Sequence, residues 1–135
     1  MKRVMVAIGG ALVLSAAGAP ASAHHSFAMF DRTKEVTLQG TIKDFQFQNP
    51  HAWIQITVPN AQGGEVEWGI ECGAPAMMLR TGWRSTTLKA GDKVTLLMHP
   101  LKDGRPSGSL IRATLADGKV LGPGGPPPRP AAKPE

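Results

Sequence analysis

The chain has 135 residues, a formal net charge of +5 and a single cysteine, Cys72. This length is enough for one modest domain, and a single cysteine excludes an internal disulfide framework. The small positive charge is weak support for a nucleic-acid partner, so we expect none. Because no disulfide can form within the chain, the core must be stabilised by the packing of apolar side chains alone.

Residues 1–23 have the three parts of a secretory signal peptide. The positive start Lys2-Arg3 precedes an uncharged apolar run, and small residues ending in Ala21-Ser22-Ala23 match the cleavage pattern. The apolar run is shorter than the ~20 residues of a membrane span, so we expect cleavage and a periplasmic protein without a membrane span. Cleavage after Ala23 makes His24 the mature N-terminus and leaves 13 basic and 10 acidic residues, a net charge of +3.

The middle of the chain has the alternating apolar pattern of β-strands. Residues 36–42 alternate, and the alternation changes phase before Phe45 and Phe47, which predicts a β-bulge near Lys43-Asp44. Asn49-Pro50 ends this first strand. Further strands are predicted at 52–58, 66–70, 93–99 and 108–115, with a short return strand at Val120.

Pro75 is typical of the first turn of a helix, which we expect to run to Arg80 and to end at Thr81-Gly82. Five strands with one short helix between the third and the fourth is the element order of an OB-fold. We therefore predict a mostly β domain over residues 24–121, a small OB-fold-like five-stranded barrel. Residues 122–135 are rich in Pro and Gly without apolar periodicity, which predicts a disordered tail.

Several short motifs occur together along the mature chain. They are His-His-Ser-Phe at 24–27, Val-Thr-Leu-Gln-Gly-Thr-Ile at 36–42, Asn-Pro-His-Ala-Trp at 49–53, Gly-Trp at 82–83 and Leu-Lys-Ala-Gly-Asp at 88–92. In this combination the chain resembles an uncharacterised family of exported bacterial proteins, named domain of unknown function 6152, over about residues 23–121. The resemblance implies export and the fold, it implies no activity, and it assigns no role to Cys72.

The sequence has none of the common catalytic motifs. It contains no nucleophile elbow, no glycine-rich phosphate loop, no CxxC and no HExxH, and its acidic residues are isolated in strand or turn contexts. We therefore predict that the protein is not an enzyme. The side chains left for binding chemistry are those with nitrogen and sulfur atoms: His24, His25, His51, His99, Met29, Met77, Met78 and Met98.

A histidine at the mature N-terminus can chelate a metal ion. The free α-amine and the ring Nδ1 of His24 can bind one ion together, and a further imidazole gives a planar set of three nitrogens, which suits Cu(II). The α-amine has a pKa of about 7.7, so little metal assistance is needed to deprotonate it near neutral pH. We choose His51 as the further imidazole, with His25 as its competitor. The predicted cofactor is therefore copper, and the predicted metal residues are His24, His25 and His51.

Each of these residues also has a structural interpretation. His24 and His25 can be a loose chain terminus, and His51 can cap its turn or bond to the backbone. His99, beside a proline at a strand end, is expected to be a surface or structural residue. Packing roles are expected for the remaining candidates, which are Trp53, Trp68, Trp83, Cys72 and at least one of Met77 and Met78.

Three functions follow from these observations. The first is a copper-binding periplasmic protein, as a carrier, buffer or sensor domain. The second is a metal-free module that binds a small molecule, glycan or protein on the face of the barrel. The third and least favoured is a copper oxidative enzyme, because a small domain without tyrosine leaves little room for a metal site and an extended substrate surface together.

Overall fold

A computed structural model describes residues 27–123 of the chain. The described chain begins with the short 3-10 helix η1, Phe27–Met29, and is otherwise built of strands and one α-helix. The strands are β1 (Val36–Gln46), β2 (Trp53–Pro59), β3 (Glu65–Glu71), β4 (Lys93–Pro100), β5 (Ser107–Thr114) and β6 (Val120–Leu121), and α1 (Pro75–Arg80) lies between β3 and β4. The predicted helix and its place after the third strand are confirmed.

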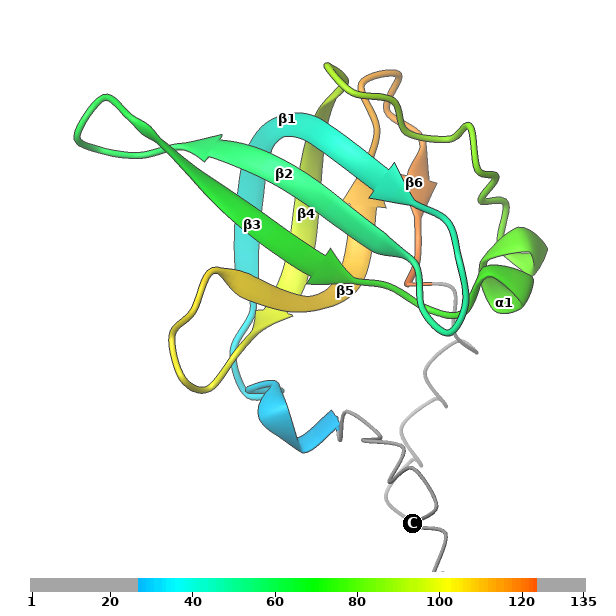
Figure 1. The fold of residues 1–135 in the computed structure, drawn as a ribbon, viewed down its shortest axis with the longest axis horizontal. Coiled ribbons are helices and arrows are strands. Elements are labelled where there is room, and N and C mark those ends of the chain that lie inside the picture. The colour runs from blue at the N-terminus through cyan, green and yellow to red at the C-terminus, as the bar shows by residue number, and fades with distance from the viewer. Residues whose placement is uncertain (1–26, 124–135) are drawn as a thin grey trace, which may run out of the picture.

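The five long strands close into a barrel, with α1 beside it (Figure 1). β1 pairs in antiparallel fashion with β2 and with β4, β2 pairs with β3, and β4 pairs with β5. The parallel pairing of β3 with β5, from Gly69–Ser107 to Glu71–Ser109, completes the ring. The predicted mostly β, OB-fold-like five-stranded barrel is therefore confirmed, and β6 is the expected short return strand, paired with the end of β5.

The long strand β1 bends, and it pairs with β4 along its first half and with β2 along its second half. The register between β1 and β2 passes from Ile42–Ile56 to Asp44–Gln55, so Lys43 is the extra residue of a β-bulge. This confirms the bulge predicted from the change of phase. Gly40 lies at the same bend, and a Cβ atom there would overlap the carbonyl oxygen of Thr57, so the strands approach closely only because residue 40 is glycine.

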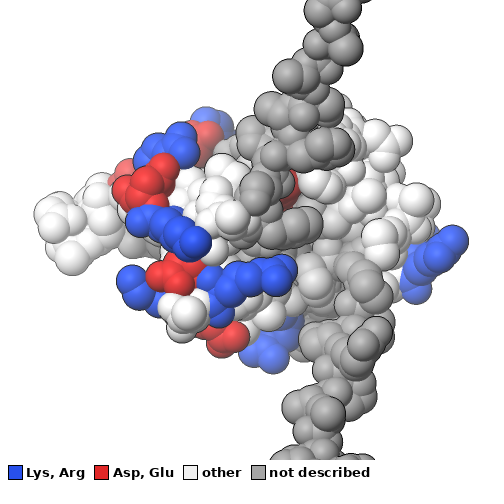
Figure 2. All heavy atoms as spheres, turned by 90° about the horizontal axis from the view of Figure 1, so that it is seen from below, with Lys and Arg blue, Asp and Glu red and all other residues white. Residues whose placement is uncertain are grey.

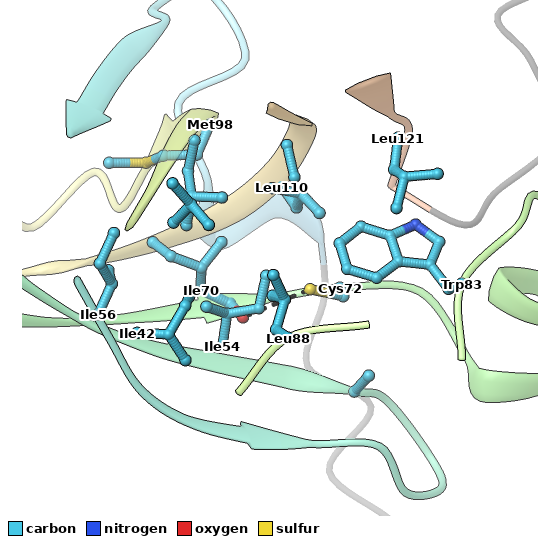
Figure 3. Close-up of a cluster of buried hydrophobic side chains, with 14 of the residues drawn as sticks. Ile42, Ile54, Ile56, Ile70, Cys72, Trp83, Leu88, Met98, Leu110 and Leu121 are labelled. Atoms are coloured by element: carbon cyan, nitrogen blue, oxygen red, sulfur yellow. Dashed lines mark hydrogen bonds between the residues drawn. The ribbon is translucent and has the colours of Figure 1, made fainter. Parts of the chain in front are cut away.

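The barrel interior is filled by apolar side chains from every long strand (Figure 3). Ile42, Ile54, Ile56 and Ile70 are fully buried, and all of them face inward from β1, β2 and β3. The fully buried Trp83, which follows α1, lies beside Leu121 of β6 in Figure 3. The strands β1, β2 and β3 thus contribute β-branched isoleucines to the core, as strands favour.

Two residues beyond β6 are still attached to the barrel. The indole Nε1 of Trp83 donates to the carbonyl oxygen of Gly122 at 2.9 Å, and the amide of Gly73 donates to the carbonyl oxygen of Pro123 at 2.8 Å. Gly122 and Pro123, the first two residues of the predicted tail, thus accept hydrogen bonds from the barrel domain. The rest of that predicted tail, and the predicted signal peptide with His24 and His25, lie outside the described residues.

Among residues 27–123 there is no helix with the length and apolar character needed to cross a bilayer.

Candidate functional site

His51 and Glu71 form a short polar contact beside a pocket of this structure. The ring Nδ1 of His51 lies 2.6 Å from Oε1 of Glu71. A carboxylate can only accept, so the hydrogen between them belongs to Nδ1. In the neutral imidazole this leaves Nε2 without a proton and with a free lone pair. The imidazole side chain is 37% exposed, so that nitrogen can be reached from outside the fold.

The pairing of β2 with β3 brings these two residues together. Trp53 is the Cα partner of Glu71, so their side chains lie on the same face of the sheet. The ladder continues beyond the strand ends, because the amide of Cys72 donates to Ala52 and the amide of Ala52 donates to Gly73. His51 is two residues before Trp53 and is therefore the diagonal neighbour of Glu71 on the same face.

Glu71 is on the outer face of the barrel, yet it is only 7% exposed. It lines a pocket of about 320 Å³, which we call the outer pocket. The chain segments around this pocket are η1 with the residue that follows it, Phe30, the end of β3, and the segment between β4 and β5. The residues lining the outer pocket are Met29, Phe30, Trp53, Glu71, Leu101, Arg105, Pro106 and Ser107.

The N-terminal wall of the outer pocket is fixed to the barrel by backbone contacts. Phe30 forms an isolated antiparallel bridge with Leu101. The amide of Asp31 donates to the carbonyl oxygen of Pro100 at 2.8 Å, and the amide of Lys102 donates to that of Met29 at 3.0 Å. Met29 and Phe30 therefore line the same pocket as Glu71, and η1 lies at the lower end of the barrel in Figure 1.

The other predicted candidates have separate positions. His99 donates from Nδ1 to the carbonyl oxygen of Lys34 at 2.8 Å, which is the structural role expected of it. Met78 is fully buried and Met77 is 40% exposed, so one methionine of the pair packs in the core as predicted. Trp83 is a packing residue, whereas Trp53 is half-buried and lines the outer pocket.

Cys72 follows Glu71 in the chain but faces the barrel interior. Burial raises the pKa of the Cys72 thiol far above its usual range, and the neighbouring Glu71 carboxylate raises it further. Its sulfur lies 3.7 Å from the carbonyl oxygen of Ile70, as Figure 3 shows. A neutral, buried thiol is a poor nucleophile and a poor metal ligand, so the predicted packing role fits.

Sequence reasoning missed Glu71. The alternation of Val66, Trp68 and Ile70 placed the next residue on the outer face of the strand, where a glutamate is ordinarily exposed and carries no signal. The pairing of β2 with β3 was the available clue. Glu71 ends β3, and its partner strand β2 begins two residues after His51, so the two residues are near neighbours.

Metal ligands are not assembled by residues 27–123 alone. Within that range no group of three or more His, Cys, Asp and Glu side chains could hold a metal ion. His51 and Glu71 come together, while His24 and His25 lie outside the described residues.

The face seen from below in Figure 1 carries charges of both signs. Figure 2 shows lysine and arginine alternating with aspartate and glutamate along one side, and a largely uncharged surface over much of the rest. Interleaved charges of this kind form ion pairs such as Lys43–Glu67, at 2.6 Å. This arrangement does not have the single sign by which proteins attract polyanions.

The chain belongs to a family of unknown function, DUF6152, whose family model matches residues 11–110. No curated protein sequence and no solved structure matches the chain. The family assignment agrees with the resemblance seen in the sequence motifs, and it assigns no activity.

Proposed function

We propose that this protein is exported, is cleaved after Ala23, and binds one copper ion through His24 and His51. In this proposal the α-amine and ring Nδ1 of His24 chelate Cu(II), and Nε2 of His51 supplies the third nitrogen. Glu71 does not touch the metal but orients the His51 ring. The protein acts as a periplasmic carrier, buffer or sensor domain.

The observation that carries the proposal is the 2.6 Å contact between His51 Nδ1 and Glu71 Oε1. A histidine that ligates a metal commonly donates its other ring N–H to a carboxylate, which fixes the tautomer and raises the basicity of the ligand nitrogen. Here the carboxylate is itself buried, and it belongs to a paired strand, so the ring is held from a rigid element. The half-exposed His51 is thus prepared to bind through Nε2.

The position of the N-terminal segment also supports the proposal. Met29 lines the same pocket as Glu71, and its carbonyl oxygen is hydrogen-bonded to Lys102. Four residues lie between His24 and Met29, so the five steps from one to the other span at most roughly 17 Å when extended. In this proposal the short connection to Met29 limits the distance over which His24 must be brought to the metal, which lowers the entropic cost of joining the two ligands. We choose His51 as the third nitrogen because Glu71 holds its Nδ1, which leaves Nε2 for the metal.

The test is a copper titration of two forms that keep every side chain. One is the exported protein with its N-terminus confirmed by intact mass, and the other carries the two additional residues Gly-Pro before His24. The extension converts the α-amine of His24 into an amide, and the proline has no amide N–H that could be deprotonated to build a new copper site at the extended terminus. We expect the extended form to bind Cu(II) at least tenfold more weakly in a competition titration and to show an altered EPR spectrum.

The matched histidine control is His99→Ala, because His99 is bonded to the backbone and lies outside the proposed site. It should leave copper affinity unchanged. Equal affinity of the cleaved and the extended proteins, or a mature N-terminus at any residue other than His24, would refute the chelate.

A further inference from the structure

The outer pocket has a feature that the proposed copper site does not use. Glu71 has two carboxylate oxygens, and His51 contacts only Oε1. Among the described residues no other hydrogen bond reaches the Glu71 side chain, and none of their buried side-chain oxygens lacks a partner. The second oxygen, Oε2, is therefore accessible, and the opening that Glu71 lines is the outer pocket.

A carboxylate with spare acceptor positions in a mostly buried setting attracts a hydrogen-bond donor. An ionised carboxylate can accept about four hydrogen bonds, and His51 supplies one. Donors that carry a positive charge make the strongest hydrogen bonds to it. The low exposure of Glu71, at 7%, reduces the competition from water for such a donor.

The walls of the outer pocket are apolar and aromatic. Met29, Phe30, Leu101 and Pro106 line it together with Trp53. Its volume of about 320 Å³ is within the range of small-molecule sites, which combine apolar walls with a few polar groups. A ligand that fits both features has a compact apolar body and one cationic group, and an aromatic wall adds a favourable cation–π contact.

Arg105 is the one cationic residue of the lining, and its charge is balanced. Its Nε donates to Oδ2 of Asp103 at 2.8 Å, and its side chain is 69% exposed. The guanidinium is thus at the solvent side of the pocket and paired with an acid of its own. The buried charge in the outer pocket is the negative charge of Glu71.

We infer that the outer pocket binds a small organic ammonium ion, with the ammonium group on Oε2 of Glu71 and an apolar body against Trp53 and Phe30. This site is separate from the copper ligands and does not require the metal. Glu71 is the one residue that this site shares with the proposed copper site. Its Oε1 contacts the copper ligand His51, and its Oε2 binds the ammonium group.

The experiment uses three probes of one shape and different charge on the exported protein freed of metal by a chelator. They are 2-phenylethylamine, which is a cation at neutral pH, the neutral 2-phenylethanol, and the anion 3-phenylpropionate. Amide and indole shifts in NMR titrations report the site. We expect the amine to shift Trp53, Glu71, Leu101 and Ser107 and to bind at least tenfold more tightly than the alcohol.

Glu71→Gln should remove the preference for the amine over the alcohol, because the amide has no negative charge. The matched control is Glu65→Gln, which makes the same change at the exposed first residue of the same strand and should keep the preference. His51→Asn should keep or strengthen amine binding, because it frees an oxygen of Glu71. The same variant should lose copper, so this site and the copper site fail independently.

The probe series decides the inference in the unaltered protein, whether or not the Glu71 variant folds. Equal binding of amine and alcohol overturns it, and so do shifts confined to residues outside the outer pocket. Tighter binding of the anion also overturns it, since that would make Arg105 the recognising group. Loss of amine binding in a folded His51→Asn protein would contradict the role of Oε2.

Discussion

The interior of the barrel and the outer pocket lie on opposite faces of the same strands, and they are built differently. The contrast is clearest between two adjacent residues at the end of β3. Cys72, just beyond the strand, is buried among apolar side chains, whereas Glu71 is buried beside His51. The interior is filled by apolar side chains, whose burial stabilises the fold. The outer pocket encloses a carboxylate, which costs free energy to bury. Substitutions in the interior should therefore reduce stability, and substitutions in the pocket should reduce binding.

The largest expected effect belongs to Trp83→Ala. Trp83 is fully buried, contacts Phe45 with ring centroids 5.7 Å apart, and donates to Gly122. Its truncation leaves a large cavity and should lower the free energy of unfolding by about 3–5 kcal/mol. Urea denaturation measures this loss. Trp53→Ala, in the half-buried pocket wall, is the matched control and should cost clearly less. Similar losses for both would erase the distinction between interior and pocket.

A pocket substitution should give the reverse result. Glu71→Gln preserves size and an acceptor oxygen but removes the negative charge that faces Nδ1 of His51, so Cu(II) affinity should fall by about 10–100-fold. The free energy of unfolding should change much less than for Trp83→Ala, since no apolar contact is lost. Copper competition titration and urea denaturation on the same samples test both statements. Glu65→Gln serves again as the control, and unchanged copper affinity in Glu71→Gln would remove Glu71 from the site.

The sequence predicted the interior far better than the pocket, and the reason is physical. The alternation around Ile54 and Ile56, the bulge at Lys43 and the helix beginning at Pro75 are local signals, and all were confirmed. The burial of Glu71 depends instead on covering segments around Phe30 and Leu101, which are distant from it in the chain. A local pattern places a glutamate on the outer face but cannot tell whether another segment covers that face.

Gly122 and Pro123 are a further place where residues distant in the chain make contact. Truncation after Pro123 should leave the melting temperature within a degree or two of that of the whole protein. Truncation after Leu121 removes the acceptors for the Trp83 indole and the Gly73 amide, about 1 kcal/mol each. The midpoint should then fall by roughly 5–15 °C. Calorimetry on the two truncated forms measures the difference. Equal midpoints would mean that the attachment of residues 122 and 123 adds nothing to the interior.

The smallest expected effect is the pH dependence of stability due to Cys72. Burial, followed by the adjacent Glu71 carboxylate, raises the pKa of this thiol, so the folded protein keeps a proton that the unfolded chain releases above about pH 8.5. The thiol's contribution to stability is therefore fully present below that pH and is lost as the pH rises. Between pH 8 and pH 10 the free energy of unfolding should fall more steeply for the unaltered protein than for Cys72→Ala, and urea denaturation at several pH values compares the slopes. Iodoacetamide at pH 9 should label Cys72 in the urea-unfolded protein and not in the folded one. Equal slopes together with rapid labelling of the folded protein would show that the interior at Cys72 is as open to water as the outer pocket beside it.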